Sequence, residues 1–202
     1  MLKLVLASQS PRRRELLYGA GYEVRVSPVK VSEIFDESLN PEVVASYLAT
    51  VKAEACLDQY NDLKSNGFLV LGADTIVVLG DQILNKPRDK GEAREFLSQL
   101  SFKTHRVITG MTLLETGSDR RRWSGVEVTE VTFRRLTAEE IEAYIATGEP
   151  MDKAGAYGIQ GEGGKFVSST AGSWSNVVGL PLERLEKVLR ENGWSVGRRA
   201  SK

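Results

Sequence analysis

Residues 68–79 read FLVLGADTIVVL, an apolar run that only Gly72, Asp74 and Thr75 interrupt. A run without polar alternation is typical of backbone buried on both faces of a sheet, and it predicts a buried strand or a strand pair. Asp74 is the costly residue, because an ionised carboxylate among apolar side chains needs a partner or a metal ion. Buried acids gather in active sites, so Asp74 is a candidate functional residue; an aspartate that caps a nearby loop is the alternative. Gly72 allows close approach of a backbone or a ligand.

Strand and helix patterns alternate on both sides of this run. Strands are predicted over residues 3–7, 82–84, 104–115, 121–135 and 166–168, and helices over 11–19, 41–60, 89–100, 137–148 and 181–192. The alternation predicts an α/β fold with a mixed sheet. A change of phase between Val128 and Val131 predicts a β-bulge. We expect one domain over residues 1–196 and a frayed tail over 197–202.

Composition excludes several classes of protein. Among 202 residues, 27 Lys and Arg balance 27 Asp and Glu, which argues against a protein that coats nucleic acid and favours a small phosphorylated ligand on a local basic patch. Cys56 is the only cysteine, so no intramolecular disulfide forms and a reducing compartment is favoured. No apolar run has the length of a membrane span, and no signal-peptide pattern is visible. We therefore expect a soluble, cytoplasmic protein with no membrane partner.

Three consecutive arginines, Arg12, Arg13 and Arg14, lie where a helix tolerates cations least. Ser10 is a good N-cap and Pro11 fits the first helical position, so the arginines fall in the first turn. A cation there is unfavourable by about 0.3–1 kcal/mol. A bound polyanion reverses that sign, because free N–H groups and arginine forks together make a phosphate site. The alternative is three solvated side chains.

Other polar residues are weaker candidates taken singly. Lys52 lies on the shoulder of an apolar helical stripe and can snorkel to solvent. Lys86 precedes Pro87, which holds it extended. The only histidine, His105, lies in an alternating strand pattern that favours a structural role over a catalytic one. If a metal ion is used, carboxylates must hold it, because nitrogen and sulfur ligands are so few, and this favours Mg²⁺ or Mn²⁺. Glu33 could join Asp74 as a ligand, although the sequence alone makes Glu33 one acidic residue among many.

A glycine-rich stretch over residues 152–164 reads DKAGAYGIQGEGG. Its glycines permit positive φ angles and close ligand contact, Tyr157 offers a stacking face, and Gln160 offers an amide that both donates and accepts. This set suits a nucleobase, and a flexible loop is the alternative. The stretch matches neither the phosphate-loop pattern nor the dinucleotide fingerprint.

These segments together resemble the Maf family of nucleoside triphosphate pyrophosphatases. The motifs that carry the resemblance are ASQSPRR at residues 7–13, GADT at 72–75, KP at 86–87, DKAGAYGIQG at 152–161 and NVVGLP at 176–181. The resemblance implies a two-lobed α/β fold around an elongated mixed sheet, with the nucleotide in a central cleft, and commonly a homodimer. It also implies cytoplasmic hydrolysis of a nucleoside triphosphate to the monophosphate and pyrophosphate with a divalent metal.

The resemblance also implies roles for individual residues. It assigns catalysis to Asp74, as general base, with Lys52 and Lys86; metal binding to Glu33 and Asp74; and substrate binding to Ser8, Ser10, Arg12, Arg13, Thr75, Tyr157 and Gln160. Arg12, Thr75 and Gln160 match the branch that favours dTTP and UTP over 7-methyl-GTP, and Thr75 with Gln160 would read the pyrimidine. Arg14 lies outside the matched pair.

Two departures from the family pattern and three rival functions remain at this point. Ser32 replaces a common aspartate before Glu33, which weakens the metal site, and Phe102 replaces a common glycine in a turn. The nearest rival is the same chemistry on 7-methyl-GTP or a non-standard purine. A nucleotide-binding regulator of cell division without turnover is the second, and a nucleic-acid-binding module, disfavoured by the balanced charge, is the third.

Overall fold

The computed structural model describes residues 1–36, 38–65, 67–117 and 120–199. Its strands are β1 (Lys3–Leu6), β2 (Val24–Val26), β3 (Phe68–Leu79), β4 (Gln82–Leu84), β5 (Thr104–Glu115), β6 (Arg122–Phe133) and β7 (Val167–Ala171). Its α-helices are α1 (Pro11–Gly19), α2 (Pro41–Gln59), α3 (Lys90–Leu100), α4 (Ala138–Ala146), α5 (Trp174–Val178) and α6 (Leu182–Glu191). Short 3₁₀ turns are η1 (Asn61–Lys64), η2 (Glu149–Asp152), η3 (Ala154–Ala156) and η4 (Glu162–Phe166).

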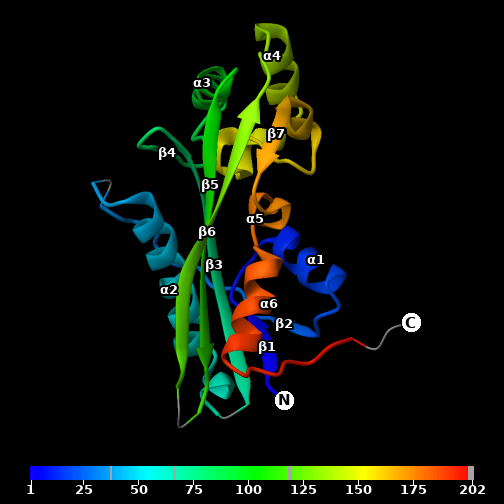
Figure 1. Ribbon diagram of the computed structural model, residues 1–202. Helices are drawn as coiled ribbons and strands as arrows, with labels where there is room; N and C mark the ends of the chain where they lie inside the picture. The colour runs from blue at the N-terminus through cyan, green and yellow to red at the C-terminus, as the bar shows by residue number, and fades with distance from the viewer. Residues whose placement is uncertain (37, 66, 118–119, 200–202) are drawn as a thin grey trace.

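The strands form one mixed sheet, which confirms the α/β prediction. Their order is β2-β1-β3-β5-β6-β7, and β4 pairs with β3. β1 runs parallel to β2 and β3, whereas β3, β5, β6 and β7 pair antiparallel. The apolar run 68–79 is a single strand of 12 residues, and together with β5 and β6 it forms the long axis of the molecule (Figure 1).

Helix α2 lies against one face of this sheet, and two glycines allow its close approach. A Cβ added at Gly72 would lie 2.2 Å from the carbonyl oxygen of Ala49, and one added at Gly110 would lie 2.0 Å from that of Ala45. Both strands therefore need glycine where the helix backbone crosses them. Gly72 therefore allows the backbone of α2 to lie close to β3.

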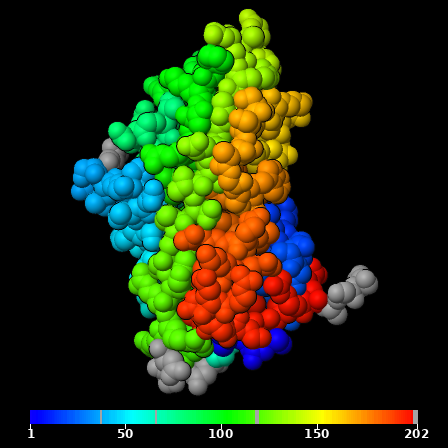
Figure 2. Space-filling view, in the orientation of Figure 1, coloured from blue at the N-terminus to red at the C-terminus, as the bar shows by residue number. Residues whose placement is uncertain are grey.

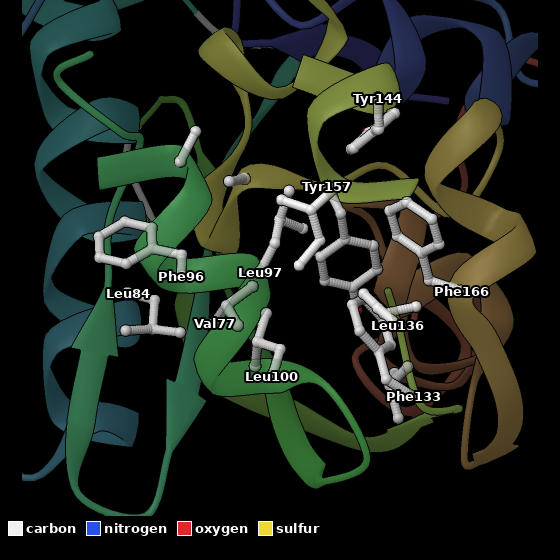
Figure 3. Packing of buried hydrophobic residues seen from close by; sticks show 14 of the residues in the cluster. Val77, Leu84, Phe96, Leu97, Leu100, Phe133, Leu136, Tyr144, Tyr157 and Phe166 are labelled. Carbon is white, nitrogen blue, oxygen red and sulfur yellow. The ribbon is translucent and has the colours of Figure 1, made fainter. Parts of the chain in front are cut away.

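Apolar clusters fill both ends of the sheet. At one end, α1 and α6 pack on β1 and β3, and Figure 2 shows α6 and the segment after it, in orange and red, covering the lower part of the visible face. At the other end, α3 and α4 enclose a cluster that includes Leu97, Phe133, Tyr157 and Phe166 (Figure 3). The candidate site lies between these two clusters.

The structure differs from the sequence-based predictions at several places. The register shift of β6 lies between Thr132 and Phe133, opposite β7, and its pairing with β5 is regular through Val128 and Val131. The predicted bulge was wrong because both faces of β6 are partly covered, so apolar residues there do not have to alternate. Helix α5 is too short to leave a periodic pattern and was not predicted.

The frayed tail predicted from residue 197 onward is hydrogen-bonded at its start. Gly197 N donates to Leu2 O at 3.3 Å, and Arg199 N donates to Gly21 O at 2.8 Å. Residues 200–202 lie outside the described residues. In the described ranges, no helix combines the length and the apolar character needed to cross a membrane.

Candidate active site

A cleft of about 810 Å³ opens beside the middle of β3. Its walls come from the turn between β1 and α1, the loop after β2, helix α2, Lys86 after β4, and the loop over residues 149–161. Every site residue expected from the sequence lines this cleft: Ser8, Ser10, Arg12, Arg13, Glu33, Lys52, Asp74, Thr75, Lys86, Tyr157 and Gln160. Segments far apart in the sequence therefore meet in one place.

The centre of the cleft is an ammonium held between two carboxylates. Asp74 is only 7% exposed in the middle of β3, and Lys52 reaches it from α2. Lys52 Nζ donates to Oδ1 of Asp74 and, at 2.7 Å, to Oε1 of Glu33. Burial raises the pKa of Glu33, but its hydrogen bond and attraction to Lys52 outweigh burial, so the net pKa is lowered. The partner that Asp74 needs is thus Lys52, which does not snorkel to solvent.

This Glu33–Lys52–Asp74 centre also sets what metal the cleft can hold. Among the described residues there is no group of three or more histidine, cysteine, aspartate and glutamate side chains placed to hold an ion. Two carboxylates nevertheless converge on a single cation, which shows that both reach one point. Mg²⁺ and similar hard ions are commonly held by one or two carboxylates together with substrate phosphates and water. The donor set fits such an ion when a phosphorylated substrate supplies the other ligands.

Arg13 is a buried cation with neutral partners. The Ser10 side chain accepts from Arg13 N at the start of α1, as the N-cap prediction required. Arg13 is 8% exposed. Its guanidinium donates to Gly179 O at 2.7 Å, Ser8 Oγ at 3.1 Å and Thr75 Oγ1 at 3.0 Å. Burial lowers the pKa of Arg13, and the charge of Asp74 opposes that effect. No carboxylate forms an ion pair with Arg13 among the described residues, so its charge stays available to an anion.

The other cations of the cleft are less tightly held. Arg12 is half-buried, and its Nη1 lies 3.9 Å from Oδ2 of Asp152. Lys86 is exposed and has no carboxylate within 4.0 Å in the described part of the chain. Arg14 is an exposed helix residue that does not line the cleft, which confirms its separation from the pair Arg12 and Arg13.

Three hydroxyl groups that were expected to contact substrate are bonded to Arg13. Ser8 Oγ and Thr75 Oγ1 accept from its guanidinium, and Ser10 Oγ accepts from its backbone at 3.4 Å. Thr75 Oγ1 also lies 2.9 Å from Thr109 Oγ1. These hydroxyls fix the position of Arg13 in the cleft wall.

The glycine-rich loop brings Gln160 to the cleft but not the face of Tyr157. Gln160 is exposed and has no hydrogen-bond partner among the described residues. Tyr157 is 5% exposed; its ring packs edge-on to Phe133 at 4.7 Å, and its hydroxyl lies 2.8 Å from Nε2 of His105. The predicted stacking face was wrong because an apolar cluster already covers the ring. His105 is buried in that cluster and does not line the cleft.

Sequence reasoning did not single out Lys153 in the cleft wall or Asn176 behind it. Lys153 lines it, and its Nζ donates to Glu149 O and to Oδ1 of Asp152, both at 2.6 Å. Asn176 lies behind it, fully buried, and its Nδ2 donates to Val107 O at 3.0 Å. The motifs that contain both residues were visible, but nothing in the local pattern indicated which side chains would be buried.

The chain is similar in sequence and in fold to known proteins. The family model named Maf, described as "Maf-like protein", matches residues 3–192. A "dTTP/UTP pyrophosphatase" of Bdellovibrio bacteriovorus is 47% identical over 186 residues, covering 92% of this chain and 96% of the relative. A "dTTP/UTP pyrophosphatase" of Desulfitobacterium hafniense is 49% identical over 195 residues, covering 96% of this chain and 87% of the relative. In fold, the chain is similar to a HAM1 protein from Coxiella burnetii, with a TM-score of 0.50, 19% identity and coverage of 95% of this chain and 100% of that one.

Proposed function

The chain belongs to the Maf family, and from that membership we propose that it hydrolyses dTTP and UTP to the nucleoside monophosphate and pyrophosphate. The printed activity of relatives at 47% and 49% identity supports the substrate. The observation that carries the chemistry is the cleft itself, in which a buried aspartate paired with a lysine lies beside a buried arginine that has no carboxylate partner.

The cations of the cleft bind the triphosphate. Arg13 is buried, Arg12 is half-buried and Lys86 is exposed, so together they offer positive charge from the floor of the cleft to its rim. Phosphoryl transfer relies mainly on positioning and on neutralising charge on the leaving group. Arg12, Arg13 and Lys86 bind the phosphates and neutralise the charge that develops on the departing pyrophosphate.

Asp74 is the general base that activates water. Its Oδ1 accepts from Lys52, and its Oδ2 has no hydrogen-bond partner within the described ranges, so that oxygen can take a proton from a water molecule at the α-phosphate. The hydrogen bond from Lys52 holds the carboxylate in position. Glu33 and Asp74 would hold Mg²⁺ or Mn²⁺, which when bound polarises the phosphate and offsets its charge.

Gln160 contacts the base. Uracil and thymine each present carbonyl oxygens and an N–H on the edge that a side-chain amide can reach, and an amide donates and accepts at once. Gln160 is exposed in the cleft wall with its amide unpaired among the described residues. A glutamate at this position loses the donor, so Gln160→Glu weakens the preference for these bases.

Assembly and location are part of the same proposal. The protein forms a homodimer, for which Val43 and Tyr47, two exposed apolar side chains one turn apart on α2, offer a surface. Sedimentation of the purified chain tests this. It works in the cytoplasm on free nucleotides without binding nucleic acid; Cys56, unpaired and buried, fits a reducing compartment.

The test is a nucleotide panel with pyrophosphate detection. We expect release from dTTP and UTP with Mg²⁺ or Mn²⁺, loss of release with chelator, and loss of activity in Asp74→Asn. Release mainly from 7-methyl-GTP or a non-standard purine triphosphate would move the protein to another branch. Tight binding of dTTP without any product would make it a nucleotide-binding regulator.

A further inference from the structure

We infer that Thr75 acts on the substrate through Arg13: its hydroxyl positions the guanidinium for the phosphates. The inference rests on the proposed function and deepens it, because it gives Thr75 a part in phosphate binding. The residues that carry it are Arg13, Thr75, Thr109 and Gly179.

Arg13 is held by acceptors from three separate segments. Ser8 belongs to the turn after β1, Thr75 to β3, and Gly179 to the end of α5. A guanidinium has five N–H groups in one plane. Three of them are used at 2.7–3.1 Å, which fixes the plane and leaves two for a ligand. All three acceptors are neutral, so they orient the charge without cancelling it.

The hydroxyl of Thr75 has no proton left for a base. A hydroxyl donates once and accepts up to twice. Thr109 Oγ1 donates to Asn176 O at 3.2 Å, and the single proton of Thr75 is placed for Thr109 Oγ1 at 2.9 Å or for Gly179 O at 3.4 Å, both of which belong to the protein. Arg13 takes one of the remaining lone pairs of Thr75. Thr75 therefore cannot donate to a carbonyl oxygen of uracil or thymine.

Strand geometry places Thr75 where it can serve Arg13. Successive side chains of a strand point to opposite faces. Asp74 meets Lys52 of α2 on one face, whereas Thr75 lies 3.4 Å from Gly179 O at the end of α5 on the other. The two neighbours thus divide the site: Asp74 belongs to the acid–lysine centre, and Thr75 belongs to the support of Arg13.

The experiment uses a ligand that has no base. Binding of inorganic pyrophosphate in the presence of Mg²⁺ is measured by calorimetry for the wild type, Thr75→Val, Thr75→Ser and Gln160→Ala. Thr75→Val keeps the shape of the side chain but loses the hydroxyl, and we expect about tenfold weaker pyrophosphate binding, the size typical of a lost hydrogen bond to a charged group. The KM for dTTP and for UTP rises by the same factor. Thr75→Ser keeps the hydroxyl and restores binding to within about twofold.

Gln160→Ala is the matched control, with a raised KM for both nucleotides and unchanged pyrophosphate binding. The inference is overturned if Thr75→Val binds pyrophosphate like the wild type and changes only the preference among bases. It is also overturned if the wild type does not bind pyrophosphate. Should Thr75→Val fail to fold, Ser8→Ala removes another hydrogen-bond acceptor of Arg13, and we expect the same weakening of pyrophosphate binding from it. A wild type that binds pyrophosphate but hydrolyses neither dTTP nor UTP refutes the proposed function and leaves the binding comparison intact.

Discussion

The buried histidine makes the stability of this protein depend on pH in a way that can be calculated. His105 is 2% exposed, its Nε2 lies 2.8 Å from the Tyr157 hydroxyl, and its Nδ1 has no partner among the described residues. Burial lowers its pKa from 6.5 to about 4. The neutral imidazole is therefore the form that the folded protein accepts.

The sign of the effect follows from this lowered pKa. As the pH falls below 6.5, the unfolded chain takes up a proton on His105 while the folded protein does not, so stability is lost on acidification. The loss amounts to about 1 kcal/mol at pH 5.5 and roughly 2–3 kcal/mol at pH 4.5. It levels off at roughly 3 kcal/mol below pH 4, where the folded form is protonated as well.

Urea unfolding followed by tryptophan fluorescence measures this loss between pH 7.5 and pH 4.5. The matched variant is His105→Gln, whose amide can still bond to Tyr157 but does not titrate. Carboxylates also titrate in this range, and subtracting the variant's pH profile from that of the wild type removes their contribution. We expect the free energy of unfolding of the wild type to fall more than that of the variant as the pH falls. Parallel profiles for wild type and variant would refute the reasoning.

Three further predictions concern the fold. Gly110→Ala should destabilise the protein by at least about 2 kcal/mol, because the new methyl group meets the backbone of Ala45 on α2; an unchanged urea midpoint would contradict this. Phe102→Gly should stabilise the protein by about 0.5–1 kcal/mol, because the φ of 59° at Phe102 favours glycine. The lost contact between the Phe102 ring and Arg135 reduces this gain, and a lowered melting temperature would count against the prediction. Thr137→Ala should cost about 1 kcal/mol by removing the capping box of α4, whereas Thr137→Ser should keep it, and equal losses in both variants would argue for another cause.

Local sequence patterns predicted many of the secondary-structure elements of this protein. The apolar run 68–79 predicted the central strand, Ser10 and Pro11 predicted the start of α1, and Thr137 with Glu140 predicted the start of α4. Such signals lie within a few residues of the structure they determine. Every site residue that the family resemblance implied also lines the cleft, but the resemblance did not show which contacts each side chain makes there.

The roles of those side chains were decided by contacts between distant segments. Arg13 bonds to Gly179, 166 positions away, and to Thr75, 62 positions away. Tyr157 was expected to stack on a base, yet His105 and Phe133 from neighbouring strands enclose its ring. A local pattern records which residues are polar, apolar or flexible, and this determined the elements and the chemical content of the cleft. Which polar group bonds to which depends on how the sheet brings remote strands and turns together, and only the tertiary structure settled that.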